Sequence, residues 1–589
     1  MYGVCGDGEL PGTVGVNPEG GCGAIIAPLA QLIDEHLAAS FAADPVLATT
    51  LGVHDHDDEL GDLSADAMQS RQAGLTGLQR GLVEIDREGL TQREALDHTV
   101  ALSDVGVALR RHVDQRVWER APYWYLERLG AALSTLMTRP FAPVEARALA
   151  LRSRLEAVPD YLTVAARSLT EDTPPVYVEM GLTAAKGLQE FLRDAVPAFA
   201  AELPSGLGQE LEAGGRSAGQ AVEDFAAVVE QLGGRARGDF AAGKDHVDFL
   251  LDTFHRVEFD HAALYEWGME QVAHDRAALE QLANELDPGS TWMDQIARIK
   301  DRHPQPEEFL TAYGDEMALA REHCLEQDLI TIPEGEICRM RWLPAYLRAS
   351  LPIAVMATTP PFEPGLESEW LITPLDPSAP EDRQRQHMRD NCYAFCRSIA
   401  GHEIYPGHHL QKVHHKLATD RSPIRRFASS PLFVEGWGLY TEDLLTETGL
   451  LTEPDVRLFK LRNALWRSAR VVVDTGLHTR GMSLDEAADV LEREVCLDRH
   501  MAEGEVKRYV RHDNPTYPSS YLLGRTAIHE LRNRVTPGAR SGSELKTFHD
   551  RLLSFGSIPI ALVAEQLDLE GTTTHPTMTR TVDDHAPPT

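Results

Sequence analysis

The sequence has no long hydrophobic run, few cysteines and a shortage of basic residues. No stretch approaches the roughly 18 apolar residues that a membrane-spanning helix requires. The 56 Lys and Arg residues are outnumbered by 91 Asp and Glu residues, which gives a formal net charge of −35. Because this charge repels phosphate backbones and anionic lipid headgroups, we expect neither nucleic acid nor membranes as partners. Seven cysteines in 589 residues are too few and too scattered for a disulfide framework.

The glycine-rich start of the chain lacks the basic and apolar regions of a signal peptide, so we expect a cytoplasmic protein. We expect residues 1–27 to be a flexible lead and residues 571–589 a flexible polar tail. Between them, we assign residues 28–250 to a helical scaffold or lid and residues 251–570 to a helical catalytic region with the metal site. No sequence feature predicts an oligomeric state.

Alternating strand patterns are scarce, and helical periodicity dominates. In residues 265–286, YEWGMEQVAHDRAALEQLANEL, apolar residues recur every three or four positions among good helix formers. The best strand candidates are residues 330–350 and 369–375, which we expect to form a small sheet or hairpin near the site. The sequence therefore predicts a mainly α protein with little β structure.

The stretch GHEIYPGHHLQ, residues 401–411, is similar to the zinc-helix pattern HExxH but has two extra residues between its histidines. In a regular helix, His402 and His408 would point about 120° apart. His402 and His409 would share a face, but about 10 Å apart along the axis, too far for two Zn–N bonds of about 2.0–2.1 Å. A regular helix therefore cannot join either pair through one ion.

Two residues inside the motif suggest how the zinc pattern is restored. Pro406 has no amide hydrogen for the helical ladder, and Gly407 tolerates backbone conformations that are closed to other residues. If this pair bulges out of the helix, the remaining residues read HExxH again. We therefore predict His402 and His408 as metal ligands and Glu403 as the general base.

A catalytic zinc site needs at least one further protein ligand, and it leaves one position open for water. Glu435 in PLFVEGWGLYTEDLL, a stretch with helical character, can complete a His₂Glu set from a second helix. Glu442 lies about two turns further along the same face and can orient a ligand histidine. The alternative for either glutamate is an ordinary solvated helix position.

Three further residues near the motif have alternative interpretations. We expect His409 to face the substrate or to support the ligands, and the alternative is that His409 replaces His408 as a ligand. Cys392 and Cys396 have the helical spacing of a metal-binding pair. Because free cysteine is commonly buried, we favour small core residues for both.

Four motifs in order, HEIYPGHHLQ, FVEGWGLYTE, VVVDTGLHTRGMS and EVKRYVRHDNPTYPSSYLLG, resemble a large bacterial family, domain of unknown function 885. The opening DPVLATTLGVHDHDDELGDLS extends the resemblance to residues 28–560. Members of this family are regarded as zinc metallopeptidases of the gluzincin type. The resemblance implies a large two-lobed, zincin-like helical fold with a central groove, one Zn²⁺ per chain and hydrolysis of a small peptide or amide.

The two C-terminal motifs add candidate catalytic residues. Asp474 and His478 are one helical turn apart and suit a carboxylate–imidazole pair that orients a ligand or donates to the substrate. The alternative is a polar pair at a helix end. Tyr521 corresponds to a tyrosine of the family pattern and can stabilise an oxyanion through its phenol, or it can be structural.

Residues near Tyr521 are candidates for substrate binding. Arg508 suits bidentate capture of a substrate carboxylate, and Tyr509 can assist it. Tyr517 begins a segment that departs from the family pattern, where a glutamine usually precedes an Ala-Leu-Ser-Tyr run. We expect this segment to shape a pocket with an unusual substrate preference.

These residues together predict a zinc-dependent hydrolase. Glu403 would take a proton from a metal-activated water and return it to the leaving amine. One alternative is a metal-dependent amidase, esterase or acyl-transfer enzyme that acts on a small metabolite in a biosynthetic pathway. The other is a non-catalytic helical binding protein, against which the glutamate beside both histidines speaks, because a structural metal site needs no base.

Overall fold

The computed structural model describes residues 26–343, 354–418, 422–539 and 542–569. Of the described residues, 72% are in helices and 3% in strands, which confirms the predicted mainly α class. The predicted tail, residues 571–589, and residues 1–25 of the predicted lead lie outside the described residues. Within the described ranges, no helix is long and apolar enough to cross a membrane.

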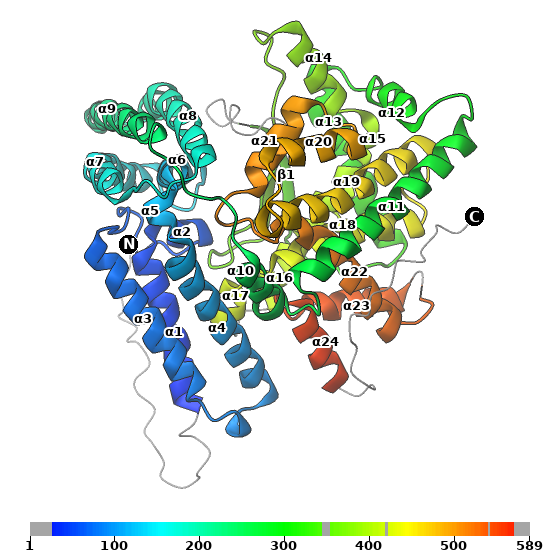
Figure 1. Ribbon diagram of the computed structural model, residues 1–589, viewed down its shortest axis with the longest axis horizontal. Helices are drawn as coiled ribbons and strands as arrows, with labels where there is room; N and C mark the ends of the chain where they lie inside the picture. The colour runs from blue at the N-terminus through cyan, green and yellow to red at the C-terminus, as the bar shows by residue number, and fades with distance from the viewer. Residues whose placement is uncertain (1–25, 344–353, 419–421, 540–541, 570–589) are drawn as a thin grey trace, which may run out of the picture.

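The first part of the chain forms two groups of helices on one side of the molecule (Figure 1). Helices α1, α3 and α4 pack together, and α6, α7, α8 and α9 form the second group. The elements are α1 (Ile26–Ala43), α2 (Pro45–Leu51), α3 (Ala65–Val83), η1 (Arg87–Gly89), α4 (Gln92–Arg110), η2 (Arg111–Gln115), α5 (Val117–Arg120), α6 (Pro122–Thr138), α7 (Val144–Ser168), α8 (Pro175–Ala200) and α9 (Ser205–Gly233).

The second part of the chain contains the helices that carry the predicted site. They are α10 (Lys244–Phe249), η3 (Leu250–His255), α11 (His261–Leu286), α12 (Trp292–Lys300), η4 (Pro306–Glu308), α13 (Phe309–Glu326), α14 (Glu381–Asp390), α15 (Tyr393–Glu403), α16 (His408–Ala418), α17 (Pro423–Phe427), α18 (Pro431–Glu447), α19 (Pro454–Thr479), α20 (Leu484–Val495), α21 (Arg499–Tyr509), α22 (Tyr517–Val535), α23 (Ser543–Leu553) and α24 (Ile560–Leu569). Helix α18 packs against α15, α16 and α22, and α19 packs against α11 and α22.

A small sheet of three strands draws on both predicted strand regions. Strands β1 (Ile337–Trp342), β2 (Ala354–Ala357) and β3 (Glu367–Ile372) pair in the order β1-β3-β2. β1 is parallel to β3, with Ile337 opposite Glu367, and β2 is antiparallel to β3. The sheet is therefore no simple hairpin, since the parallel pair needs a crossover. The end of the first predicted region, residues 344–350, lies outside the described residues.

Two hydrophobic cores organise the helices. The smaller core is formed by residues between Val46 and Val229, mainly from α6 to α9. The larger core combines residues of α1, α3 and α4, such as Ile33 on α1, with residues as far along the chain as Ala564. Side chains from before and after residue 250 thus pack in one core, which fixes the N-terminal helices against the site region.

Helices α18 and α22 cross in direct backbone contact. A Cβ added to Gly436 would lie 2.4 Å from the Cα of Gly524, and one added to Gly524 would lie 1.9 Å from the carbonyl oxygen of Leu432. Only glycine fits at either position. This crossing brings the start of α22 beside the first turns of α18, where Glu435 lies.

We predict that Gly524→Ala destabilises the protein, because its methyl group would force the two helices apart. Overpacking of this kind costs about 1–3 kcal/mol or more, so the midpoint of thermal unfolding should fall by several degrees. Gly219→Ala in α9 is the matched control, since no atom lies within 4 Å of the added Cβ. Because alanine is the better helix former, the control should leave the midpoint unchanged or raise it.

Candidate metal centre

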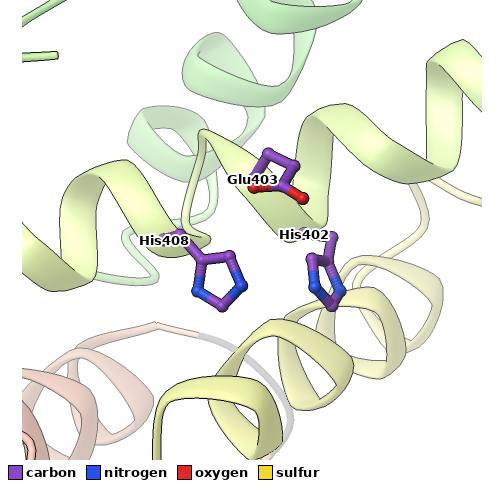
Figure 2. A group of neighbouring side chains, drawn as sticks. All are labelled: His402, Glu403 and His408. Carbon is purple, nitrogen blue, oxygen red and sulfur yellow. The ribbon is translucent and has the colours of Figure 1, made fainter. Parts of the chain in front are cut away.

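The two histidines of the motif lie at the facing ends of separate helices. Helix α15 ends at Glu403 and α16 begins at His408, so the four residues between them are not helical. The predicted bulge within one continuous helix is therefore wrong, and the motif is broken into two helices. Figure 2 shows His402 and His408 on either side of this break, with both imidazole rings on the same side of the connecting loop.

Contacts from neighbouring backbone and from α18 hold the break. The indole Nε1 of Trp437 donates to the carbonyl oxygen of Pro406 at 2.9 Å. Gly407 lies against the end of α15, where an added Cβ would be 1.8 Å from the carbonyl oxygen of His402. The loop therefore requires glycine at position 407. It accepts Pro406 because the helical hydrogen bonds of α15 have already ended before this residue.

The imidazole of His402 is held by a carboxylate at Nδ1, the ring nitrogen that is not the candidate metal ligand. Its Nδ1 lies 2.8 Å from Oε1 of Glu442, and only 4% of the residue is exposed. Burial acts to raise the pKa of Glu442, but the hydrogen bond to His402 and the charge of Arg467 hold that pKa below its usual range. The carboxylate thus orients the imidazole and leaves Nε2 free for a ligand.

Glu403 and the second histidine lie close to His402. The ligand atoms of His402, Glu403 and His408 are all within 4.8 Å of one another. The two imidazole rings are 4.8 Å apart between centroids and nearly perpendicular, at 88°. Two nitrogens and a carboxylate oxygen therefore converge on a volume of the size that one metal ion occupies.

Glu435 approaches the same place from α18. Its Oε2 lies 3.7 Å from Nε2 of His408, and its Oε1 accepts a hydrogen bond from the hydroxyl of Tyr517. Burial acts to raise the pKa of Glu435, yet the neighbouring His408 lowers it to about 2. Burial likewise acts to lower the pKa of His408, but Glu435 and Glu403 raise it to about 9. Without a metal ion, His408 and Glu435 therefore form an ion pair.

His409 is not brought to this cluster. Its Nδ1 lies 2.9 Å from Oγ of Ser368 in β3, and its Nε2 lies 2.7 Å from Oε2 of Glu336, which directly precedes β1. Tyr405 donates to the same carboxylate oxygen at 2.6 Å. Because the ring is fully buried with both nitrogens occupied, it neither faces a substrate nor replaces His408. His409 instead ties α16 to the sheet.

Tyr517, Tyr521 and Arg508 lie on the Glu435 side of the cluster. The rings of Tyr517 and Tyr521 are 5.8 Å apart, and Tyr521 is 8% exposed. Burial and the charge of Glu435 raise the pKa of Tyr521, so its phenol keeps its proton. The guanidinium carbon of Arg508, which is 43% exposed, lies 5.8 Å from the ring centroid of Tyr517.

Tyr509, in contrast, is committed to a buried network. Its hydroxyl donates to Oε2 of Glu505 at 2.6 Å and accepts from Nε of Arg470 at 2.9 Å. Arg470 also donates to Glu505 at 3.0 Å and packs over the ring of Tyr521. The Tyr509 hydroxyl is therefore not available to a substrate carboxylate, and Arg470 and Glu505 position Tyr521.

Asp474 and His478 are also buried and bound to backbone groups. Asp474 accepts hydrogen bonds from Thr516 and Ser519 at the start of α22. The backbone N–H of Ala242 donates to Nδ1 of His478, and Nε2 lies 3.2 Å from the carbonyl oxygen of Tyr509. Burial lowers the pKa of His478 to about 4. The structure thus places this neutral ring as a tie between loops, away from the role of an oxyanion donor.

Sequence reasoning missed several residues that shape the site. Gly438 is the clearest, because a Cβ there would lie 2.7 Å from Nε2 of His402. A glycine inside a helical pattern is a sequence signal for close approach. Glu336, Ser368 and Arg470 gave no such signal. Cys392 and Cys396 are free and buried in the larger core, as favoured for the pair.

The profile of a family described as bacterial proteins of unknown function, DUF885, matches residues 45–567. The chain belongs to this family. No curated protein matches this DUF885 protein.

Two solved structures resemble this DUF885 protein over most of its length. One, a "putative lipoprotein of unknown function" from Shewanella oneidensis, is 19% identical with a TM-score of 0.74. The other, a "putative lipoprotein" from Colwellia psychrerythraea, is 17% identical with a TM-score of 0.78. Each match covers 92% of this chain and 99% of the other. At these identities the likeness establishes a shared fold.

We predict a pH dependence of stability that depends on Asp474. Burial raises the pKa of its carboxyl to about 7 from a usual 3.8. Between pH of about 4 and about 7 the native state therefore holds a proton that the unfolded chain has lost. Since the unfolded state binds fewer protons, the contribution of Asp474 to the free energy of unfolding falls as pH rises, by up to about 1.4 kcal/mol per pH unit.

The measurement is chemical denaturation of wild type and Asp474→Asn at several pH values in this window. The stability of wild type relative to the variant should fall as pH rises and level off above about pH 7. Asp160→Asn on the exposed face of α7 is the control and should parallel wild type. A difference between wild type and Asp474→Asn that does not change with pH contradicts the assignment.

Proposed function

We propose that this DUF885 protein is a zinc-dependent hydrolase that cleaves a peptide or amide bond with Glu403 as general base. The observation that carries the proposal is the convergence of His402, Glu403 and His408, whose ligand atoms lie within 4.8 Å of one another. A two-lobed, zincin-like arrangement with a substrate groove is part of the same proposal. His402, His408 and Glu435 would hold one Zn²⁺.

The donor set suits zinc. Two imidazoles and one carboxylate form a common catalytic set that leaves a coordination position open. Two atoms bound to one tetrahedral zinc are about 3.4 Å apart, and the 3.7 Å between His408 and Glu435 is close to this value. Gly438 leaves room beside Nε2 of His402, where any larger residue would place a Cβ at 2.7 Å.

In the proposed reaction, bound zinc would supply Lewis-acid activation of water and of the scissile carbonyl. Glu403, half-buried at the end of α15, would accept the proton of the water and pass it to the leaving amine. Tyr521, which keeps its phenolic proton, would donate a hydrogen bond to the developing oxyanion. Glu442 would hold His402 in the orientation that presents Nε2.

A non-peptide amidase, esterase or acyl-transfer enzyme is the second candidate. The burial of the donor residues favours this candidate. His402, His408 and Glu435 are each less than one-tenth exposed, and a site this buried suits a small substrate. Assays of the purified protein against short peptides and against non-peptide amides and esters separate the two candidates.

We predict that Glu403→Gln keeps the metal but loses hydrolysis by about 10²–10⁴-fold, because general-base catalysis is removed while the ligands remain. Zinc content by mass spectrometry and the rate of cleavage of short peptides are the two measurements. Glu435→Gln is the contrasting variant and should lower zinc content. Unchanged activity in Glu403→Gln would contradict the role of Glu403 as general base.

We further predict that Gly438→Ala weakens zinc binding by more than about tenfold, because its methyl group would displace the imidazole of His402. Equilibrium dialysis against a zinc buffer gives the affinity. Gly504→Ala in α21, where no atom lies within 4 Å of the new Cβ, is the control and should bind zinc as wild type does. Equal affinity in both variants would rule out His402 Nε2 as a ligand atom.

A further inference from the structure

Lys412 is a cation beside the candidate site that the proposed reaction does not use. It lies on α16 one turn after His408, so the two side chains share a face of the helix. It is half-buried, and no carboxylate within the described ranges forms an ion pair or hydrogen bond with it.

The charge that Lys412 experiences most is that of Glu435. Burial lowers the pKa of the Lys412 ammonium to about 8, and Glu435 opposes this shift. In the proposed zinc-bound state the charge of Glu435 is shared with the ion. Lys412 would then lie next to the reacting centre with its own charge uncompensated, and it would attract an anionic group of the substrate.

The other nearby cations already have partners. Arg470 is bound to Glu505 and to the hydroxyl of Tyr509. Arg508 lies 3.7 Å from Glu505 and is the more exposed of the two. Arg467 donates to the backbone carbonyl oxygen of Asn463 at 3.3 Å, and its charge acts on Glu442, the carboxylate that holds His402. Lys412 is therefore the cation best placed to bind an anion on the Glu435 side of the cluster.

We propose that Lys412 binds the α-carboxylate of the residue that leaves, so that the substrates are dipeptides, short peptides or N-acyl amino acids with a free C-terminus. The proposal rests on the proposed hydrolase function. The separation of Lys412 from His408 along α16 supports this proposal. One helical turn rises about 5.4 Å, and one residue of extended substrate spans about 3.3–3.6 Å. A lysine one turn from a ligand can thus reach a carboxylate one residue from the scissile bond.

The test measures binding rather than turnover. Zinc-loaded Glu403→Gln protein is titrated with glycyl-leucine and with glycyl-leucinamide by calorimetry. The free acid should bind about 10–100-fold more tightly, as expected for a charge-assisted hydrogen bond of about 1.5–3 kcal/mol. Adding Lys412→Met should reduce this preference to less than about threefold, whereas Lys412→Arg should retain part of it.

Lys186→Met, at an exposed position of α8, is the control and should leave the preference unchanged. Zinc content and the unfolding midpoint show whether each variant is folded and loaded. Equal affinity for both probes, binding of neither probe, or a preference that survives Lys412→Met overturns the inference, while cleavage of other amides would leave the hydrolase proposal standing. Failure of the parent protein to bind zinc overturns the hydrolase proposal itself.

Discussion

The rest of the site depends on how closely α18 can approach its neighbours, and this is set by glycine. Gly436 allows backbone contact with α22, and Gly438 makes room for the imidazole of His402. On either side of these glycines in sequence, the same helix carries Glu435 and Glu442 toward the two histidines. A side chain at either glycine would hold both carboxylates too far away to contact an imidazole.

The second requirement is a rigid break between α15 and α16. Trp437 holds the loop from one side through the carbonyl of Pro406. From the other side, His409 joins the start of α16 to the sheet through Glu336 and Ser368. The small sheet is remote in sequence from the motif, yet it determines where the second helix begins and hence where His408 points.

Charge around the cluster is arranged in opposing pairs. His408 and Glu435 compensate each other, and the Arg470–Glu505–Tyr509 network lies buried behind Tyr521. Asp474 caps the start of α22 through backbone and hydroxyl donors. Against this background Lys412 is distinctive because its charge has only the long-range influence of Glu435. The proposal that Lys412 binds a substrate carboxylate depends on this lack of a directly bound carboxylate.

The sequence by itself determined the mainly helical class and the regions of β1 and β3, because periodicity is a local property of the chain, but β2 (Ala354–Ala357) lies outside both predicted strand regions. It also identified His402, Glu403 and His408 from the spacing of one motif, and the structure brings these three together. Only the tertiary structure decided that the motif spans two helices and that His409 contacts the sheet. It also decided that the hydroxyl of Tyr509 is already hydrogen-bonded within the protein. These outcomes depend on partners that are distant in sequence, such as Glu336 for His409 and Arg470 for Tyr509. Hydrogen bonds to such partners form only after the helices have packed, so no local pattern encodes them.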